Sequence, residues 1–282
     1  LADSITILFN PLTLSIILAK EFTVAETLVS PAKSICALDE LLIDPEEPFT
    51  SYCKVPEGCR NSSRSRSYCV PLIVIDFGGS AVIGETIEWL GAEHLLEKRA
   101  RSDNVKSKIS KAVEFQRQFS EAKGINLLGN NPGHQNIEAG LSTIEEKSLG
   151  NITKSGSKRI EDVLQWGEKI DKKGMFLMHA PSYAPESLSG FSAAGCQVTL
   201  FSTGVGNSFT NHISPSIKFS ANPETCEQLN NQLDFKCADV FLGKKTFEDA
   251  SNNIWNFMID VCSGALTWGE IFNDSSEVFS RI

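Results

Sequence analysis

The chain has 282 residues and a formal net charge of -9. An acidic protein of this kind is a poor candidate for sequence-independent binding to nucleic acid or to an anionic membrane, so we expect neither partner. Hydrophobic residues make up 41% and charged residues 22%, which is typical of a globular protein with enough core for one large domain or two smaller ones.

The first 70 residues differ from the rest. The apolar run 5–19 contains Asn10 and Pro11 and is shorter than the roughly 20 residues of a membrane-spanning helix, so we interpret it as buried structure. The serine-rich stretch 51–69 has no helical or strand period and predicts a loop or a poorly ordered linker. We therefore expect a boundary near residue 70, with an atypical, partly disordered segment 1–70 before an α/β region 71–282. Because residue 1 is Leu rather than Met, we expect an N-terminal piece to be missing from this sequence.

The cysteines carry no clear signature. None of the eight belongs to a C-x-x-C pair. Cys53, Cys59 and Cys69 are close enough in sequence for a metal or disulfide cluster, but their spacing fits no zinc pattern. We interpret the cysteines as reduced thiols of a cytoplasmic protein.

The region after residue 70 begins with apolar runs on both sides of Gly78 and Gly79, which predict a strand, a turn and a strand over 70–86. Apolar residues at helical spacing then predict helices over 86–100 and 104–124, the second ending at Gly124.

Residues 126–142 show no periodicity and predict a loop. After it, one helix face is indicated, with Ser157 as its N-cap, by the spacing of Ile160, Val163, Leu164, Gly167 and Ile170.

The C-terminal half alternates between strands and helices. Strands are predicted at 174–180, 196–202 and 216–222, a helix or loop at 182–195, and a helix at 246–264 that ends at Gly264. This order predicts an α/β fold with a mainly parallel sheet, flanking helices and glycine-rich loops at the strand ends. Ligands of such sheets bind in the loops after the carboxyl ends of strands, so the candidate loops are 84–88, 179–183 and 202–208.

Glu85 and Glu88 follow the end of a predicted strand. If a helix begins at Thr86, both carboxylates share its N-terminal side, where the helix dipole favours their ionised form and a cation could lie between them. The alternative is that these acids only complement the dipole.

Polar groups also gather in the loop 130–136, which includes His134. Asparagine carboxamides can bind the hydroxyl and carboxylate groups of a polar substrate, but such residues are equally common in ordinary turns. Two lysines, Lys147 and Lys218, lie beside apolar runs. On a strand, Lys218 points opposite to Ile217 and Phe219, either into a site or, unless the strand is central, to solvent.

The stretch 202–208 reads Ser-Thr-Gly-Val-Gly-Asn-Ser and follows a predicted buried strand. Glycines let the main chain approach an anion closely, although the same residues can form a simple tight bend. The chain contains no P-loop, no nucleophilic-serine elbow and no dinucleotide fingerprint. Nucleotide binding is therefore not supported.

From about residue 74 onward, four collinear segments carry a resemblance to a known family: GGSAVIGETIEWLGAEHLL, NNPGHQNIEAGLSTIEEKSLGNITKSGS, AAGCQVTLFSTGVGNSF and PSIKFSANPET. The sequence resembles the altronate and galactarate dehydratases, a group that includes the large subunit of sulfolactate sulfo-lyase. The resemblance implies a lyase that removes the proton α to a carboxylate and eliminates water from a sugar acid, giving a 2-keto-3-deoxy acid. It also implies a divalent metal cofactor, Fe²⁺ or else Mn²⁺ or Mg²⁺, and either a homo-oligomer or a separate small N-terminal subunit.

The resemblance assigns roles residue by residue. The implied catalytic residues are Glu85, Glu88 and Lys147. The implied substrate-binding residues are Asn131, Asn136, Gly204, Gly206 and Lys218. The metal ligands are unassigned. Further positions match the family pattern without an assigned role, namely Pro132, Glu146, Gly150 and Asn222.

Several positions depart from the family pattern. Gly84 replaces its serine, Ala184 replaces an aspartate, and no upstream Gly-Gly-Ser-Asp segment occurs in residues 1–75. Val205 replaces an arginine, whose planar fork would bind a carboxylate. These losses leave open an inactive remnant or paralogue of the family. A third alternative is a sulfolactate-type C–S lyase that releases bisulfite, which the stretch 184–190 resembles more closely.

Overall fold

The computed structural model describes residues 13–18, 70–76, 78–125, 131–138, 141–180 and 184–278. The strands are β1 (Thr13–Leu18), β2 (Ser80–Ile83), β3 (Ile160–Leu164), β4 (Gly174–Met178), β5 (Val198–Ser202), β6 (Ser216–Ser220) and β7 (Phe235–Lys236). The helices are α3 (Val70–Asp76), the 3₁₀-helix η2 (Thr86–Trp89), α4 (Glu93–Glu97), α5 (Asp103–Ala122), α6 (His134–Glu138), α7 (Ile144–Lys154), α8 (Ala184–Ala193), α9 (Pro223–Gln228), α10 (Ala238–Phe241), α11 (Phe247–Cys262) and α12 (Trp268–Phe272).

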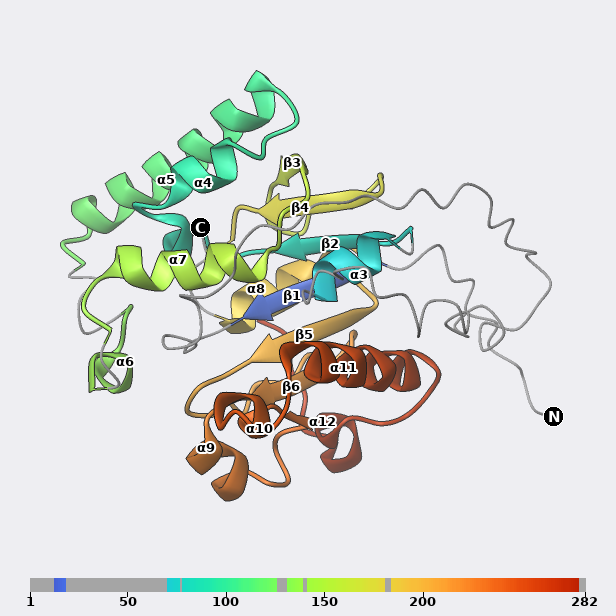
Figure 1. The fold of residues 1–282 in the computed structure, drawn as a ribbon. Coiled ribbons are helices and arrows are strands. Elements are labelled where there is room, and N and C mark those ends of the chain that lie inside the picture. The colour runs from blue at the N-terminus through green and yellow to red at the C-terminus, as the bar shows by residue number, and fades with distance from the viewer. Residues whose placement is uncertain are drawn as a thin grey trace, which may run out of the picture.

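The strands form one seven-stranded sheet in the order β3-β4-β2-β1-β5-β6-β7. Every neighbouring pair is parallel, so the prediction of an α/β fold with a parallel sheet is confirmed. In Figure 1 the strand arrows point to the left, toward the side on which α6 lies. The central strand β1 comes from the apolar run 5–19, on the N-terminal side of the boundary expected near residue 70.

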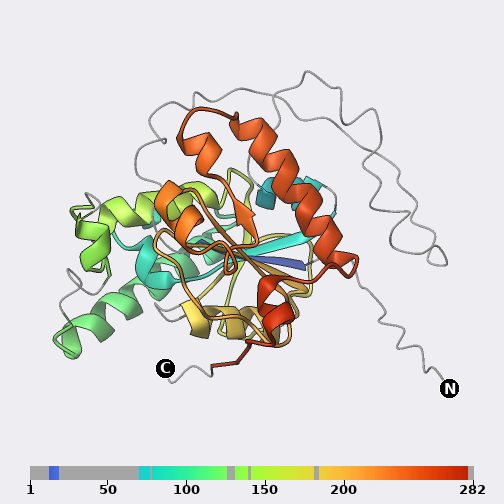
Figure 2. The same ribbon diagram turned by 90° about the horizontal axis from the view of Figure 1, so that it is seen from below.

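Helices cover both faces of the sheet. Ala81 and Ile83 of β2 pack in one apolar layer with residues of η2, α4, α5, α7 and α11. Val82, between them, belongs to the opposite layer, which contains residues of α8. Figures 1 and 2 show this division, with α11 and α8 on opposite sides of the sheet. The alternation follows from the period of a strand, which points successive side chains to opposite faces.

Two of the predicted elements have the wrong type. Residues 70–76 form helix α3 rather than a strand, ending where Gly78 adopts a φ of 81°. A short apolar run does not distinguish a strand from a buried helix, and a proline such as Pro71 is tolerated in a first helical turn.

Residues 160–164 form strand β3 rather than a helix. The pairing of β3 with β4 shifts register between Ile160 and Asp162, so Ile160 and Val163 face the same layer although they are three positions apart. A bulge in a strand can therefore imitate the spacing of a helix face.

Of the remaining predicted elements, two differ in part from the structure and the others are confirmed. The predicted loop 126–142 contains the short helix α6, and the predicted helix 86–100 is divided into η2 and α4 at Gly91, which has a φ of 78°. The structure confirms the helices at 104–124 and 246–264 and the strands at 174–180, 196–202 and 216–222. None of the described helices is long and apolar enough to span a membrane.

Half of the cysteines lie in the described part of the chain. Cys196, Cys226, Cys237 and Cys262 form no disulfide bond with one another there, and the reduced state expected from the sequence stays a prediction. The proposed cluster of Cys53, Cys59 and Cys69 lies outside the described residues.

The glycine-containing turn 203–206 follows β5 next to the point where the chain changes direction across the sheet. From β1 the chain continues to β2 on one side, and from β5 to β6 on the other, and ligands of open α/β sheets bind at such switch points. Thr225 Oγ1 donates to Gly204 O at 2.5 Å, and Gly206 N donates to Thr203 Oγ1 at 3.0 Å. The turn is therefore fixed both internally and by α9.

Gly206 allows a test of how tightly this turn is packed, because Gly195 provides a matched control. Both glycines have a φ of 95°, but a Cβ at Gly206 would lie 2.2 Å from Leu229 Cδ1, whereas one at Gly195 would meet nothing within 4 Å. We expect Gly195→Ala to lower the free energy of unfolding by about 1 kcal/mol through backbone strain. Gly206→Ala should cost about 1 kcal/mol more because Leu229 must move. Equal losses in urea unfolding would show that the turn accommodates the methyl group freely.

Candidate active site

The site is built around a sharp corner at the carboxyl end of β2. Glu85 adopts a left-handed conformation with a φ of 60° and a ψ of 61°, and its side chain is only 4% exposed. Trp89 Nε1 donates to Gly84 O at 3.1 Å and Thr86 N donates to Ala180 O at 3.3 Å, which hold the corner. A non-glycine residue in this conformation costs about 1–2 kcal/mol, and such strain is found disproportionately at functional sites.

Gly84 leaves little room at this corner. A Cβ built on Gly84 would lie 3.0 Å from Phe191 Cζ and 3.4 Å from Ala180 Cβ. Phe191 belongs to α8 and is fully buried. The serine that the family pattern places at residue 84 would therefore require Phe191 to move.

Directly after the corner, Glu88 forms a buried ion pair with Lys147. Glu88 Oε1 lies 2.7 Å from Lys147 Nζ, and the two side chains are 3% and 4% exposed. Asn131 contacts both charges: its Oδ1 accepts from Lys147 Nζ, and its Nδ2 donates to Glu88 Oε1 at 3.4 Å. Asn151 Nδ2 donates to the Glu88 carbonyl at 3.4 Å. The structure thus brings three of the predicted site residues into direct contact with one another, and Glu88 N donates to Glu85 O at 2.7 Å.

Lys147 lies on the first turn of helix α7. Its N-cap, Thr143, accepts from Glu146 N at 3.2 Å, while Glu146 Oε2 accepts from both the N and the Oγ of Ser142 at 2.9 Å. These bonds lower the pKa of Glu146 and assign that family-matched residue to helix capping. The Thr-x-x-Glu spacing of residues 143–146 is the sequence signal that would have predicted this helix.

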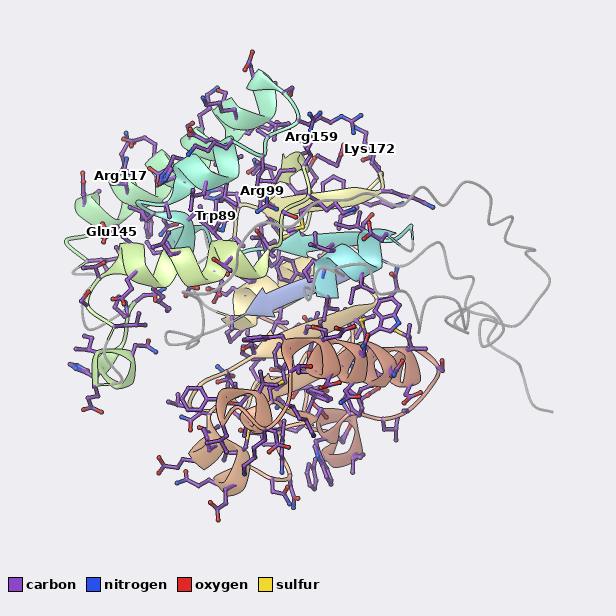
Figure 3. All side chains as sticks on the ribbon, viewed as in Figure 1. Trp89, Arg99, Arg117, Glu145, Arg159 and Lys172 are labelled. Carbon is purple, nitrogen blue, oxygen red and sulfur yellow. The ribbon has the colours of Figure 1, made fainter. Side chains whose placement is uncertain are left out.

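Helix α7 also lies very close to η2. A Cβ on Gly91 would come within 2.2 Å of Glu145 Cγ, so a glycine at residue 91 is needed for this approach. Figure 3 labels Trp89 on η2 and Glu145 on α7. The close contact between the two helices sets Glu88 opposite Lys147.

Asn136 stabilises the loop that carries Asn131. It is 1% exposed, and its Oδ1 accepts from Gly133 N at 3.1 Å. The two predicted asparagines therefore act on the same loop, and the side chain of Asn131 is the one that reaches Glu88.

His179 is a member of the site that the sequence analysis placed in a candidate loop without assigning it a role. It follows β4, the neighbour of β2, and its Nδ1 lies 3.0 Å from Thr86 Oγ1. The ring of Phe115 from α5 packs against it edge-on at 5.3 Å between centroids. Burial lowers the pKa of His179. A histidine directly after a buried strand, at the carboxyl edge of a sheet, was the available signal.

Lys218 lies apart from this cluster. It points opposite to Ile217 and Phe219, as predicted, but it is only 2% exposed because β6 lies between β5 and β7. Its Nζ donates to Ser208 O at 3.3 Å and to Thr210 Oγ1 at 3.2 Å.

The charge of Lys218 is affected by its surroundings in opposite directions. Burial lowers the pKa of Lys218, while Asp234 and Asp274 favour its charged form. In the described part of the chain, the hydrogen-bond acceptors of the Lys218 ammonium group come from the loop after β5 and not from the Glu88 cluster.

The glycine turn and the remaining family-matched positions lie elsewhere on the carboxyl edge. Gly204 and Gly206 follow β5, which β1 separates from β2. Asn222 caps α9 by accepting from Glu224 N and Thr225 N. Ala184 is buried at the start of α8, and Val205 is 44% exposed on the turn.

The described side chains do not form a metal site by themselves. Within these ranges, no group of three or more His, Cys, Asp and Glu side chains could hold an ion. The Glu88 carboxylate already forms an ion pair with Lys147. A divalent cation bound here would need donors from other parts of the chain, and its presence stays a prediction from the family resemblance.

Breaking the buried ion pair should destabilise the protein strongly. Lys147→Met leaves the Glu88 carboxylate buried without its counter-charge, and we expect a loss of about 3–5 kcal/mol in the free energy of unfolding. Lys158→Met is the matched control, because Lys158 pairs with Asp76 while both are largely exposed, at 41% and 56%, and should cost less than about 1 kcal/mol. Urea unfolding at pH 7 measures both. Equal losses in the free energy of unfolding would mean that water solvates the Glu88 carboxylate once the Lys147 ammonium group is removed.

Comparison with known proteins identifies the family of the chain. Residues 70–281 match the family model described as D-galactarate/Altronate dehydratase, C-terminal. The chain is 31% identical over 207 residues to the (2R)-sulfolactate sulfo-lyase subunit beta of Chromohalobacter salexigens, covering 73% of this chain and 53% of that protein. It is 35% identical over 189 residues to the altronate dehydratase of Bacillus subtilis, covering 67% of this chain and 38% of that protein.

The chain is also similar to a galactarate dehydratase. The galactarate dehydratase (L-threo-forming) of Escherichia coli is 28% identical over 194 residues, covering 68% of this chain and 36% of that protein. The chain thus spans between about a third and a half of the length of these curated relatives. Since the family model covers most of the chain, the chain belongs to the D-galactarate/altronate dehydratase family, a family of sugar-acid lyases.

Proposed function

We propose that this chain takes part in the elimination of water from a sugar acid of the altronate or galactarate type, giving a 2-keto-3-deoxy acid. The observation that carries the proposal is the buried, strained Glu85 at the carboxyl edge of the sheet, joined by a backbone hydrogen bond to Glu88, which forms the buried pair with Lys147. Strained backbone, buried charge and position at a strand end are features that functional sites share.

In the proposed reaction Glu85 is the base. Its carboxylate removes the proton from the carbon α to the substrate carboxylate, and the electron pair moves onto that carboxylate. The electron pair then forms a carbon–carbon double bond as the C–O bond on the β carbon breaks, and the leaving hydroxide takes the proton from Glu85 and departs as water. The resulting enol tautomerises to the keto acid. Because the α proton is weakly acidic, hydrogen-bond donors or positive groups must stabilise the doubly charged intermediate.

Glu88, Lys147 and Asn131 act mainly as positioning residues in this proposal. Their mutual contacts and the very low exposure of the two charged side chains support this role. They hold η2 against α7, and η2 begins immediately after Glu85. Asn136 contributes by fixing the loop of Asn131.

The glycine turn after β5 is the proposed place for the second carboxylate of galactarate, remote from the α proton, because β1 separates β5 from the Glu85 corner on β2. Gly206 N is used within the turn, but the N–H groups of Gly204 and Val205 have no acceptor among the described residues. Backbone N–H groups of this kind bind anions. Lys218 would contribute indirectly, by holding the loop at Ser208 and Thr210.

The sulfolactate branch is the second candidate. Of the relatives compared above, the sulfo-lyase subunit beta is the one of which this chain covers the largest share, 53%. In that case bisulfite would leave in place of water. Because that relative is named as a subunit, the proposal includes a separate partner subunit, with a homo-oligomer as the alternative.

The proposed activity can be tested with the purified full chain, reconstituted anaerobically with Fe²⁺ and offered altronate, galactarate or (2R)-sulfolactate. We expect a 2-keto-3-deoxy acid from at least one of the sugar acids, and Glu85→Gln should reduce its formation by at least about 100-fold because the base is lost. Release of bisulfite from sulfolactate alone would favour the second candidate. The absence of product from all three would instead favour an inactive member of the family.

Val205 allows a separate test of the glycine turn. Because its side chain is 44% exposed, Val205→Arg should leave the free energy of unfolding within about 0.5 kcal/mol of the wild-type value. If the turn binds the remote carboxylate, the added guanidinium should lower the KM for galactarate about tenfold, the effect of a charge-assisted hydrogen bond worth about 1.5 kcal/mol. Val205→Leu is the uncharged control. An unchanged KM for both variants would place the carboxylate elsewhere.

A further inference from the structure

The hydrogen bonds of Thr86 determine which nitrogen of His179 carries a proton. Thr86 is fully buried, and its Oγ1 accepts from Ala180 N at 3.0 Å. The remaining neighbour of this hydroxyl group among the described residues is His179 Nδ1, at 3.0 Å. A hydroxyl group has one hydrogen to donate, and a buried hydrogen without an acceptor is costly. The Thr86 hydroxyl therefore donates to His179 Nδ1.

This bond fixes the imidazole in its neutral Nε2–H form. When Nδ1 accepts a hydrogen bond, the proton of a neutral ring resides on Nε2. Burial also lowers the pKa of His179 and so favours the uncharged ring at neutral pH.

The opposite edge of the ring carries Nε2. Nε2 makes no hydrogen bond to any residue in the described part of the chain, and the side chain is partly exposed. Phe115 packs edge-on against the ring at 5.3 Å between centroids and restricts its rotation. The result is an oriented N–H donor on β4, adjacent to the Glu85 corner of the neighbouring strand β2.

We propose that His179 is a further catalytic residue, whose neutral Nε2–H donates a hydrogen bond to a carboxylate oxygen of the substrate. The inference rests on the proposed function, because that oxygen gains negative charge when Glu85 removes the α proton. A fixed, uncharged donor stabilises such charge without giving up its proton, so no proton is transferred to or from His179.

Two substitutions separate this role from a structural one. The side-chain oxygen in His179→Asn lies close to the position of Nδ1 and can still accept from Thr86, but the donor at the Nε2 position is lost. In His179→Gln the amide nitrogen lies near the position of Nε2 and can still donate, but the acceptor for Thr86 is lost. One variant thus keeps the structural contact and the other keeps the contact with the substrate.

The two variants should rank in opposite orders for activity and for stability. We expect the kcat of His179→Asn to fall about 100-fold, as on removal of an oxyanion donor, with the KM changed less than about threefold, and His179→Gln to retain most of the activity. In urea unfolding His179→Asn should be the more stable variant. Activity that follows the stability order, or Asn and Gln variants of equal activity, would overturn the role of His179 while leaving the proposed elimination intact.

Nitrogen-15 NMR of the histidine rings tests the protonation state without any substrate. The chain has only four histidines, and the His179→Asn spectrum identifies the signals of His179. We expect a neutral Nε2–H ring at pH 7 in the wild type and a mixture of both neutral forms in Thr86→Val. A charged ring or an Nδ1–H ring in the wild type would overturn the inference. If the wild type converts none of the three acids, the proposed function is wrong and the catalytic role of His179 falls with it.

Discussion

The buried ion pair between Glu88 and Lys147 is the constraint on which the rest of the site depends. Removing two charges from water costs several kcal/mol per ion, and the cost is recovered only when the geometry is good and the remaining hydrogen-bonding sites are satisfied. Asn131 satisfies both partners, which ties the loop before α6 to the pair. The close approach of Gly91 to Glu145 ties α7 to η2. The strained backbone of Glu85 is thus supported by three segments that the ion pair holds together.

Much of the fold could be predicted from the sequence, because the strands of a parallel sheet are short apolar runs and the long helices have a clear period. The errors have physical causes. The bulge in β3 gave Ile160 and Val163 a helical spacing, and the apolar run of α3 carried no period at all. The position of β1 at the centre of the sheet depends on pairing between distant residues, which no local pattern reports.

The candidate site was only partly predictable, because several of its contacts join residues far apart in the chain. Glu85, Glu88 and Lys147 were found by position and resemblance, but the bond between Glu88 and Lys147 joins residues far apart in the chain. His179 was missed because its proposed role depends on Thr86, the first residue of η2, which is far from it in the chain. The direction of the Lys218 side chain was predicted correctly from the strand period. Only the order of the strands and the contacts of its ammonium group show that it is buried and bound to the loop after β5.

Gly84 and Phe191 lie on different elements but are restricted by each other. The phenyl ring of α8 occupies the space that any side chain at residue 84 would enter, and the ring is fully enclosed. A serine at residue 84 would require the ring of Phe191 to shift by a few tenths of an ångström. The choice of residue at the corner after β2 is therefore coupled to the position of a ring on α8.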